Sequence, residues 1–220
     1  MSQPSHSLVH LTREPHRLQP GLPPLLLLLH GVGSNERDLF AMADHLDGRF
    51  RVVSARAPLT LGPDSYAWFH ATITDAEREF DSDEAEQSRL ALVSFIGDVT
   101  GRYNTDPRRV YLMGFSQGAI MSLSLALTSP ELVAGVVAMS GLLLPGVQPK
   151  IASPDLKGMP ILVVHGTEDQ LLSIHYGRNV RDRVSALPVD LTYREYPMGH
   201  EVTAQSLADV VAWLKDRLDS

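Results

Sequence analysis

The sequence predicts an α/β protein, with one domain built around a mostly parallel sheet that carries helices on both faces. Three observations predict this fold. Strand-like apolar runs alternate with amphipathic helical patterns along most of the chain. The central runs are apolar at every position, which is typical of strands that are covered on both faces. The 220 residues, 44% of them hydrophobic, suffice for one sizeable core.

We expect this domain to comprise residues 1–220. The segment 1–20 is expected to be irregular apart from an edge strand at 8–12, because several prolines and a glycine follow it. Residues 25–30 are continuously apolar as far as a terminal histidine and predict the first central strand.

A glycine-containing loop at 31–35 ends that strand. A helical pattern over about 36–46 comes next, with Asn35 as its cap. The following strand is predicted at 51–54. Residues 55–83 have neither periodicity and are expected to be irregular, although a cluster of aromatic residues argues against disorder.

The second half of the chain alternates more regularly. The predicted strands are 109–113, 133–139, 161–165 and 191–196, and the predicted helices are 84–103, 119–127, 174–187 and an apolar stripe from Leu207 to Leu218. In mostly parallel sheets, ligands bind at the carboxyl ends of the strands. We therefore look for functional residues in the loops that follow these strands.

The composition excludes several classes of function. The net charge is −7 and no basic stripe is interleaved with aromatic residues, so nucleic acid is not an expected partner. The chain has no cysteine, which excludes disulfides, thiolate metal sites and a cysteine nucleophile. No signal peptide is recognisable, and the apolar run at 25–29 is far too short to cross a bilayer. We expect a cytoplasmic protein without a membrane span.

The segment GFSQG at 114–118 matches the Gly-x-Ser-x-Gly pattern of a nucleophile elbow, in which a sharp strand-to-helix turn exposes a serine hydroxyl. We expect Ser116 to have a strained backbone, and Gly114 and Gly118 to have no room for a Cβ. The Gln117 N–H then lies at a helix N-terminus, aimed at an oxyanion, while its side chain is expected to contribute little. Taken alone, the motif also fits a glycine-rich turn with an incidental serine.

A serine nucleophile needs a base and an acid, which on this type of sheet follow it in the order acid, then histidine. His200 follows the last predicted strand in a short loop, whereas His175 lies in a predicted helix, so we expect His200 to be the base. Asp169 lies past a glycine turn after the preceding strand and is the expected acid. Its neighbour Glu168 remains an alternative.

The loop HGVG at 30–33 follows the first central strand and can supply the second N–H of an oxyanion hole. We expect the Val32 N–H to act there together with that of Gln117. His30 is expected to be structural, with its ring hydrogen-bonded to the loop backbone. No Asp/His cluster has metal-ligand spacing and no phosphate-binding loop is present, so neither a metal nor an organic cofactor is expected.

Read in chain order, the motifs LLLHGVG, AWF, GFSQGA, MSG, HGTED and GHE resemble the phospholipase/carboxylesterase family over nearly the whole chain. These small α/β hydrolases include the acyl-protein thioesterases. The resemblance implies an α/β-hydrolase fold with Ser116, Asp169 and His200 as the catalytic triad and Val32 and Gln117 as the oxyanion hole. It also implies a serine hydrolase that cleaves carboxylic esters through an acyl-serine intermediate.

Two departures from the eukaryotic thioesterases bear on the substrate. The first loop reads GVGSNE where those enzymes tend to have GLGD, and His70 follows Trp68 and Phe69 where they tend to carry an aspartate. A small bacterial-type carboxylesterase is therefore the expected analogue. Acyl-thioesterase or lysophospholipase activity on longer chains is the alternative, followed by a non-catalytic binding module on the same fold. Dienelactone-type hydrolases use a cysteine, which this chain lacks.

The expected partner is a small-molecule ester, and because exposed apolar loops of some family members pair, a homodimer is also expected. Apolar residues in or next to the loops after the strands are predicted to form walls for an acyl chain, although ordinary core packing would explain them as well. These residues are Trp68, Phe69, Leu142, Leu143, Leu144, Leu171 and Leu172.

Overall fold

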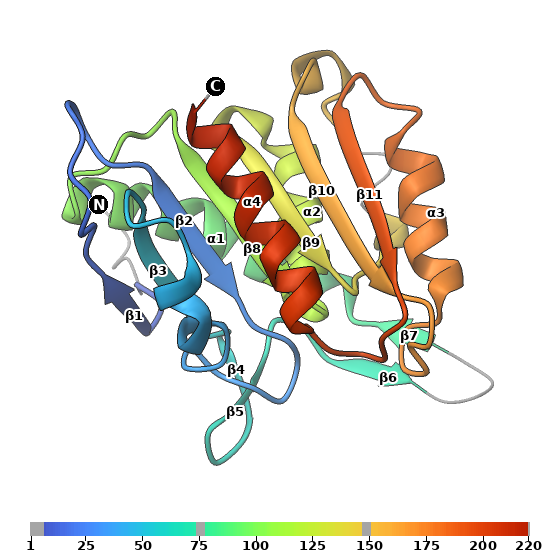
Figure 1. Ribbon diagram of the computed structural model, residues 1–220. Helices are drawn as coiled ribbons and strands as arrows, with labels where there is room; N and C mark the ends of the chain where they lie inside the picture. The colour runs from blue at the N-terminus through green and yellow to red at the C-terminus, as the bar shows by residue number, and fades with distance from the viewer. Residues whose placement is uncertain (1–6, 74–77, 147–150, 220) are drawn as a thin grey trace.

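A seven-stranded sheet forms the centre of the molecule (Figure 1). The structure, a computed structural model, describes residues 7–73, 78–146 and 151–219. Across the sheet the strands are β1 (His10–Arg13), β3 (Arg51–Ala55), β2 (Leu25–Leu29), β8 (Val110–Phe115), β9 (Gly135–Met139), β10 (Pro160–Gly166) and β11 (Asp190–Tyr196). β1 is antiparallel to β3 and every other neighbouring pair is parallel, which confirms the predicted α/β fold.

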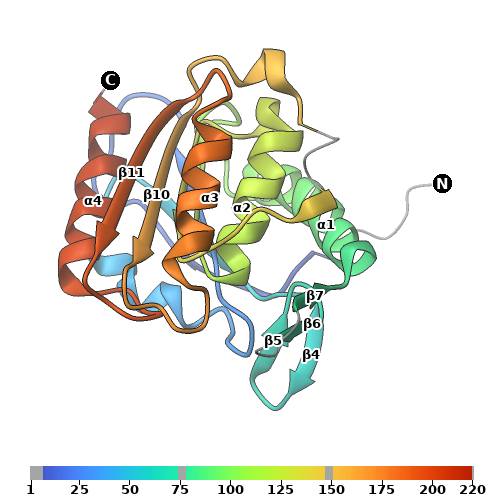
Figure 2. The same cartoon turned by 90° about the vertical axis from the view of Figure 1, so that its right-hand side faces the viewer.

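Helices cover both faces of the sheet (Figure 2). One face carries α1 (Ser82–Arg102), α2 (Gln117–Thr128) and α3 (Ile174–Val184), and the other carries the 3-10 helix η1 (Leu39–His45) and α4 (Ala204–Asp219). Two shorter 3-10 turns are η2 (Pro130–Leu132) and η4 (Ser153–Leu156). Within the described ranges, no helix combines the length and the apolar character that a membrane crossing requires.

The all-apolar sequence of β2 follows from this layering. Leu25, Leu27 and Leu29 pack into the core beneath α1, α2 and α3, while Leu26 and Leu28 pack into the core beneath η1 and α4. A polar residue at any of these positions would be buried without a partner on one face or the other. The strand is therefore held at the centre of the sheet.

The register of the strands brings their carboxyl ends to one edge. Leu29 of β2 is opposite Gly114 of β8, and Phe115 of β8 is opposite Met139 of β9. Gly166 at the end of β10 is likewise opposite Tyr196 at the end of β11. The loops that carry the predicted site residues therefore leave the sheet side by side.

The helical pattern predicted over about 36–46 is wrong at its start, because the structure has a helix, the 3-10 helix η1, over Leu39–His45. The Asn35 side chain does accept the Arg37 N–H at 3.0 Å, but the next residues form turns. Glu36 is 3% exposed, and Arg56 donates to its carboxylate at 2.6 and 2.7 Å. This ion pair with a residue just beyond β3 holds the chain in a turn where a helix would start.

Residues 55–83 were expected to be irregular, and this is also wrong. They include two small antiparallel hairpins, β4 (Leu59–Gly62) with β5 (Ser65–Ala67), and β6 (Ala71–Ile73) with β7 (Arg78–Phe80). Tyr66 of the first hairpin pairs with Ser34 and Gly33 through backbone hydrogen bonds of 2.9 Å each. The first hairpin therefore braces the loop that follows β2.

The other predicted elements are present with boundaries shifted by a few residues. β1 lies at 10–13, where an edge strand was expected at 8–12. β11 is the strand at the opposite edge of the sheet, and of its seven residues only Tyr196 is buried. The sheet is thus best covered at β2 and β8 and least covered at β11.

Candidate active site

Ser116 stands between the last residue of β8 and the first residue of α2, in a backbone conformation of φ 53° and ψ −118°. This region is sparsely populated by residues other than glycine and costs about 1–3 kcal/mol. A Cβ on Gly114 would lie 2.2 Å from the Gly118 carbonyl oxygen, and one on Gly118 would lie 1.9 Å from that of Leu29. The expected strain and the expected crowding of both glycines are confirmed.

His200 lies between Ser116 and Asp169. Its Nε2 is 2.9 Å from the Ser116 Oγ, and its Nδ1 is 2.7 Å from the Asp169 Oδ2. These distances fit a hydroxyl that donates to Nε2 and an Nδ1–H that donates to the carboxylate. Ser116 and Asp169 are 5% and 4% exposed, so both are shielded from bulk water. The structure brings together the three residues named from the sequence.

The two alternatives lie elsewhere. Glu168 is exposed, and its backbone N–H donates to the Met198 carbonyl at 3.1 Å. His175 is exposed near the start of α3, and its ring lies against that of Tyr176. Neither side chain is hydrogen-bonded to Ser116 or His200 within the described part of the chain.

The Asp169 carboxylate is held by its own loop. Its Oδ1 accepts the N–H groups of Leu171 and Leu172 at 3.0 and 2.7 Å, which leaves Oδ2 for His200. The loop is closed from behind by His165, whose Nε2 donates to the Leu172 carbonyl at 2.7 Å and lies 3.6 Å from the Asp169 Oδ2. The acid is thus fixed in position before it meets the imidazole.

Sequence reasoning missed His165, which it treated only as the end of a strand. The residue is 0% exposed, and a Cβ on Gly177 would lie 2.6 Å from its ring, so α3 packs directly against it. The available signal was a single imidazole at the end of an otherwise apolar strand, four residues before the predicted acid.

The two predicted oxyanion donors lie close to the nucleophile. The Gln117 N–H is in the first turn of α2, where helix N–H groups have no intrahelical acceptor. The loop that carries Val32 lies against Ser116, because a Cβ on Gly31 would be 3.2 Å from the serine Cβ. Among the residues that the structure describes, neither the Val32 N–H nor the Gln117 N–H donates to an acceptor.

His30 is structural, as expected. Its Nδ1–H donates to the Gly31 carbonyl at 2.7 Å, and its Nε2 accepts the Ala57 N–H at 3.0 Å. Both bonds are satisfied by a neutral imidazole, and burial lowers the pKa of His30. The ring therefore joins the loop after β2 to the loop after β3.

The expectation that the Gln117 side chain contributes little is wrong. Its Oε1 accepts the Trp68 N–H at 3.0 Å, and its Nε2 donates to the Phe69 carbonyl at 2.7 Å. The Trp68 indole N–H in turn donates to the His30 carbonyl at 3.0 Å. The amide side chain thus anchors the Trp68–Phe69 segment beside the elbow.

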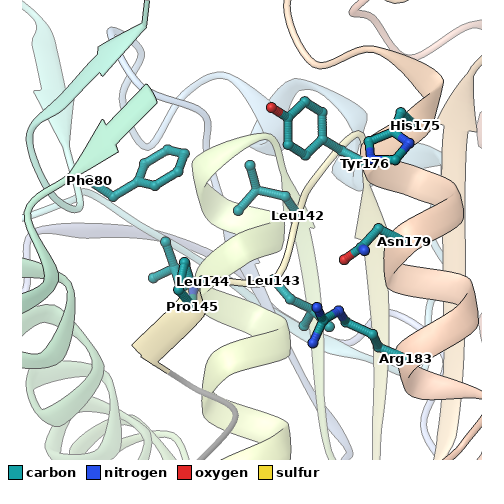
Figure 3. A pocket seen from close by; sticks show the side chains of 9 residues that line it. All are labelled: Phe80, Leu142, Leu143, Leu144, Pro145, His175, Tyr176, Asn179 and Arg183. Carbon is teal, nitrogen blue, oxygen red and sulfur yellow. The ribbon is translucent and has the colours of Figure 1, made fainter. Parts of the chain in front are cut away.

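The structure divides the seven predicted acyl-wall residues. Leu142, Leu143 and Leu144 line a cavity of about 280 Å³ (Figure 3). Trp68 and Phe69 are each 0% exposed, so they belong to the core and offer no surface to a substrate, while Leu172 is buried in the same core and does not line that cavity. Leu171 is 42% exposed and does not line that cavity. The aromatic pair was misassigned because Gln117 and His30 turn it inward.

The described residues contain no group of three or more His, Asp or Glu side chains arranged to hold a metal ion. A hydroxyl, an imidazole, a carboxylate and two N–H groups are the parts that acyl transfer requires.

Comparison with known proteins agrees with this chemistry. The family model described as Phospholipase/Carboxylesterase matches residues 20–218. The chain is 27% identical to the acyl-protein thioesterase 1 of Mycosarcoma maydis, over 86% of this chain and 89% of that protein. It is also 27% identical to a probable carboxylesterase, SOBER1-like, of Arabidopsis thaliana, over 89% of this chain and 79% of that protein.

A further alignment, with an acyl-protein thioesterase 1 of Gibberella zeae, reaches 32% identity but spans 49% of that protein. Among solved structures, esterase PE8 superposes with a TM-score of 0.82 and 27% identity, over 96% of this chain and 99% of the other. The fold and most of the length of the chain are therefore shared with esterases.

Proposed function

Because the chain belongs to the phospholipase/carboxylesterase family, we propose that it is a carboxylesterase whose nucleophile is Ser116. The observation that carries this proposal is the position of His200, whose two ring nitrogens are 2.9 Å from the Ser116 Oγ and 2.7 Å from the Asp169 Oδ2. One imidazole can therefore accept the serine proton while the carboxylate fixes its tautomer.

In the first half of the reaction the Ser116 Oγ attacks the ester carbonyl carbon as His200 Nε2 takes the hydroxyl proton. The carbonyl oxygen becomes an oxyanion, which the N–H groups of Val32 and Gln117 stabilise by about 3 kcal/mol each. The imidazolium then gives its proton to the leaving alcohol, and an acyl-Ser116 remains. Asp169 stays ionised and stabilises the positive charge on the ring.

In the second half a water molecule attacks the acyl-serine. His200 takes a proton from this water, the same N–H groups stabilise the second oxyanion, and the proton returns to Ser116 as the carboxylic acid is released. No further proton donor is needed, because the same imidazole serves in both halves.

Replacing Ser116 with alanine tests the proposal. Hydrolysis of short-chain esters should fall about 10⁴-fold or more, because the nucleophile is lost and only binding and the oxyanion donors remain. A fluorophosphonate should label the natural protein at Ser116 and should not label the Ser116→Ala variant. Ser94→Ala, at an exposed serine on α1, is the matched control and should keep both properties. Absence of labelling in the natural protein would favour a non-catalytic binding module.

The second candidate function is hydrolysis of acyl thioesters or lysophospholipids. The similarity to the acyl-protein thioesterase 1 of Mycosarcoma maydis favours the thioesters. The triad itself does not discriminate, since esters and thioesters pass through the same tetrahedral intermediate. The cavity of about 280 Å³ favours short acyl groups, because it lies at the lower end of the roughly 300–1,000 Å³ typical of ligand pockets. Relative kcat/KM values for matched esters and thioesters of increasing chain length decide between the two.

Two further proposals concern the state of the protein in the cell. A cytoplasmic location is supported by the absence of cysteine, because the fold needs no oxidising compartment. A homodimer stays a prediction, and light scattering on the purified protein measures its mass directly. Cell fractionation with an antibody to the chain checks the location.

A further inference from the structure

The cavity beside Leu142–Leu144 has two unlike walls (Figure 3). One wall is apolar and consists of the three leucines with Phe80 and Pro145. The other is a face of α3, from which His175, Asn179 and Arg183 extend at intervals of four residues, with the aromatic ring of Tyr176 beside His175 (Figure 3). A ligand that fills the cavity therefore meets hydrocarbon on one side and hydrogen-bond donors on the other.

The walls continue from the segments that hold the candidate triad. Leu142 comes three residues after Met139, whose carbonyl accepts the Ser116 N–H at 2.9 Å. Phe80 packs edge-on against Phe69, whose carbonyl is bound by the Gln117 side chain. The α3 wall begins just after Leu172.

Leu172 is itself tied to the triad, because its N–H donates to Asp169 at 2.7 Å. Three segments that hold the triad thus lead to the walls of the cavity, while its lining includes none of Ser116, Asp169 and His200. The nearer end of α3 is its first turn, with His175, and Arg183 lies eight residues further along, or about 12 Å on an α-helix.

Arg183 differs from the other arginines of α3. Arg178 is paired with Glu195 at 2.9 Å, and Arg181 is paired with Asp182 at 2.8 Å. Among the residues that the structure describes, no carboxylate lies within 4.0 Å of the Arg183 guanidinium, and none lines the cavity. The chain as a whole carries 26 acidic and 19 basic residues, so a cavity with an unpaired cation and no acid departs from the general charge.

We propose that this cavity binds an acyl chain that ends in a carboxylate, and that the enzyme therefore prefers monoesters of dicarboxylic acids. The inference rests on the proposed esterase function. The chain packs against the leucines and Phe80, and its terminal carboxylate binds the Arg183 guanidinium, with the Asn179 amide as a second donor. The guanidinium fork matches the two oxygens of a carboxylate.

The acyl half of the ester, rather than the alcohol half, is assigned to the cavity because only the acyl half stays attached to Ser116 between the two steps. A pocket that holds it keeps the acyl-serine aligned for the attacking water.

Two matched series of ethyl esters test the proposal. One contains monoethyl esters of dicarboxylic acids of six to ten carbons, and the other contains ethyl esters of fatty acids of the same lengths. The natural protein should show a higher kcat/KM for the dicarboxylic series at one or two lengths, and added salt should reduce this preference. Arg183→Gln should lower the ratio between the series about tenfold or more, and Arg183→Lys should restore part of it.

Arg181→Gln is the control, because Arg181 is the neighbouring arginine with its own acidic partner. It should leave the ratio unchanged. If Arg183→Gln lowered kcat/KM equally for both series of esters, the proposal would be overturned, and Arg183 would only stabilise the C-terminal end of α3. A preference for a carboxylate on the alcohol half would overturn it as well.

A binding measurement separates this inference from the proposed function. Calorimetry with the Ser116→Ala variant and a dicarboxylic monoester should show binding that the Ser116→Ala, Arg183→Gln double variant loses. Equal kcat/KM values for the neutral and the dicarboxylic esters would overturn the inference, while the proposed esterase function would still hold. Absence of both ester cleavage and Ser116 labelling would overturn the proposed function.

Discussion

At the scale of single residues, the site depends on groups that serve two purposes. Gln117 is the best example, because its backbone N–H is a proposed oxyanion donor while its side chain is hydrogen-bonded to the Trp68 N–H and the Phe69 carbonyl at 3.0 and 2.7 Å. One residue can serve both purposes because the turn that starts α2 lies beside the Trp68–Phe69 segment. Removal of the amide should therefore affect stability while the backbone N–H remains.

We expect Gln117→Ala to lower the free energy of unfolding by about 2–4 kcal/mol, because the substitution leaves a backbone N–H and a carbonyl buried without partners. Urea unfolding followed by circular dichroism measures the change. Gln170→Ala is the control, since Gln170 is exposed in the adjacent catalytic loop. Equal stability of the two variants would show that water replaces the lost bonds.

Sequence reasoning at this scale worked for residues defined by order and spacing, and it failed for residues defined by packing. Ser116, Asp169 and His200 follow the parallel strands β8, β10 and β11, so the topology brings all three to the same edge of the sheet. His165 was missed and Trp68 was misassigned, because their roles depend on which partner faces them across the fold. No pattern along the chain reports that the Trp68 indole N–H meets the His30 carbonyl.

At the scale of secondary structure elements, the close approach of α2 to β2 is the most demanding contact. Gly118 has no space for a Cβ, whose nearest neighbours would be backbone atoms of Leu29 and His30 at 1.9–2.8 Å. Gly97 in the middle of α1 has open space around its own Cα. The same substitution should therefore have opposite effects at the two positions.

We expect Gly118→Ala to destabilise the protein by about 3 kcal/mol or more, because backbone cannot move aside as a flexible side chain can. Gly97→Ala should stabilise it by about 0.5–1 kcal/mol, through the higher helix propensity of alanine. Thermal unfolding of both variants measures the difference. A stable Gly118→Ala protein would contradict the packing described between α2 and β2.

The turn before η1 depends on the ion pair between Glu36 and Arg56, in which the hydrogen bonds from Arg56 lower the pKa of Glu36 to about 2. The carboxylate titrates near 4.5 in the unfolded chain, so the folded state favours its charged form. The pair therefore contributes its full stabilisation above about pH 5 and loses it progressively as the pH falls towards 2.

We expect the natural protein to lose about 2–3 kcal/mol more stability than Glu36→Gln between pH 6 and pH 2.5, because only the natural protein has this carboxylate to protonate. Urea unfolding at a series of pH values checks the difference between the two proteins. Parallel pH profiles would show that the pair does not contribute.

Short secondary structure elements were predicted less well from the sequence than long ones. Long strands and helices were predicted within a few residues, since their periodicity extends over many positions. The four strands of the hairpins have three or four residues each, too short for any periodicity to be recognised. The helix expected from about 36 starts at Leu39, because the Glu36–Arg56 pair that holds the preceding turn is formed across the fold.

At the scale of the whole molecule, the parts of the site come from unequal regions of the sheet. The predicted nucleophile and both oxyanion donors follow β2 and β8, which lie near the centre of the sheet. The predicted acid and base follow β10 and β11, and β11 is an edge strand with one neighbour and little burial. The mostly parallel sheet could be inferred from the alternation of strands and helices along the chain, but the unequal cover of its strands could not.

We expect the backbone amides of β11 to exchange with deuterium at least 100-fold faster than those of β2 in the folded protein, because edge strands open locally at a smaller cost in free energy. Hydrogen exchange followed by mass spectrometry of peptides compares the two segments. Equal protection of β2 and β11 would show that the sheet opens only as a unit.

The position of β11 at the edge also means that the protein can lose activity reversibly before it unfolds. Fraying of this strand would carry His200 away from Ser116 while the central strands, and with them the strained elbow, keep their shape. Mild heat or denaturant would then yield molecules that most optical probes report as folded but that do not hydrolyse esters. These molecules would regain activity on cooling or on removal of the denaturant. In such a protein, loss of turnover reports on one strand and its loop well before it reports on the unfolding of the chain.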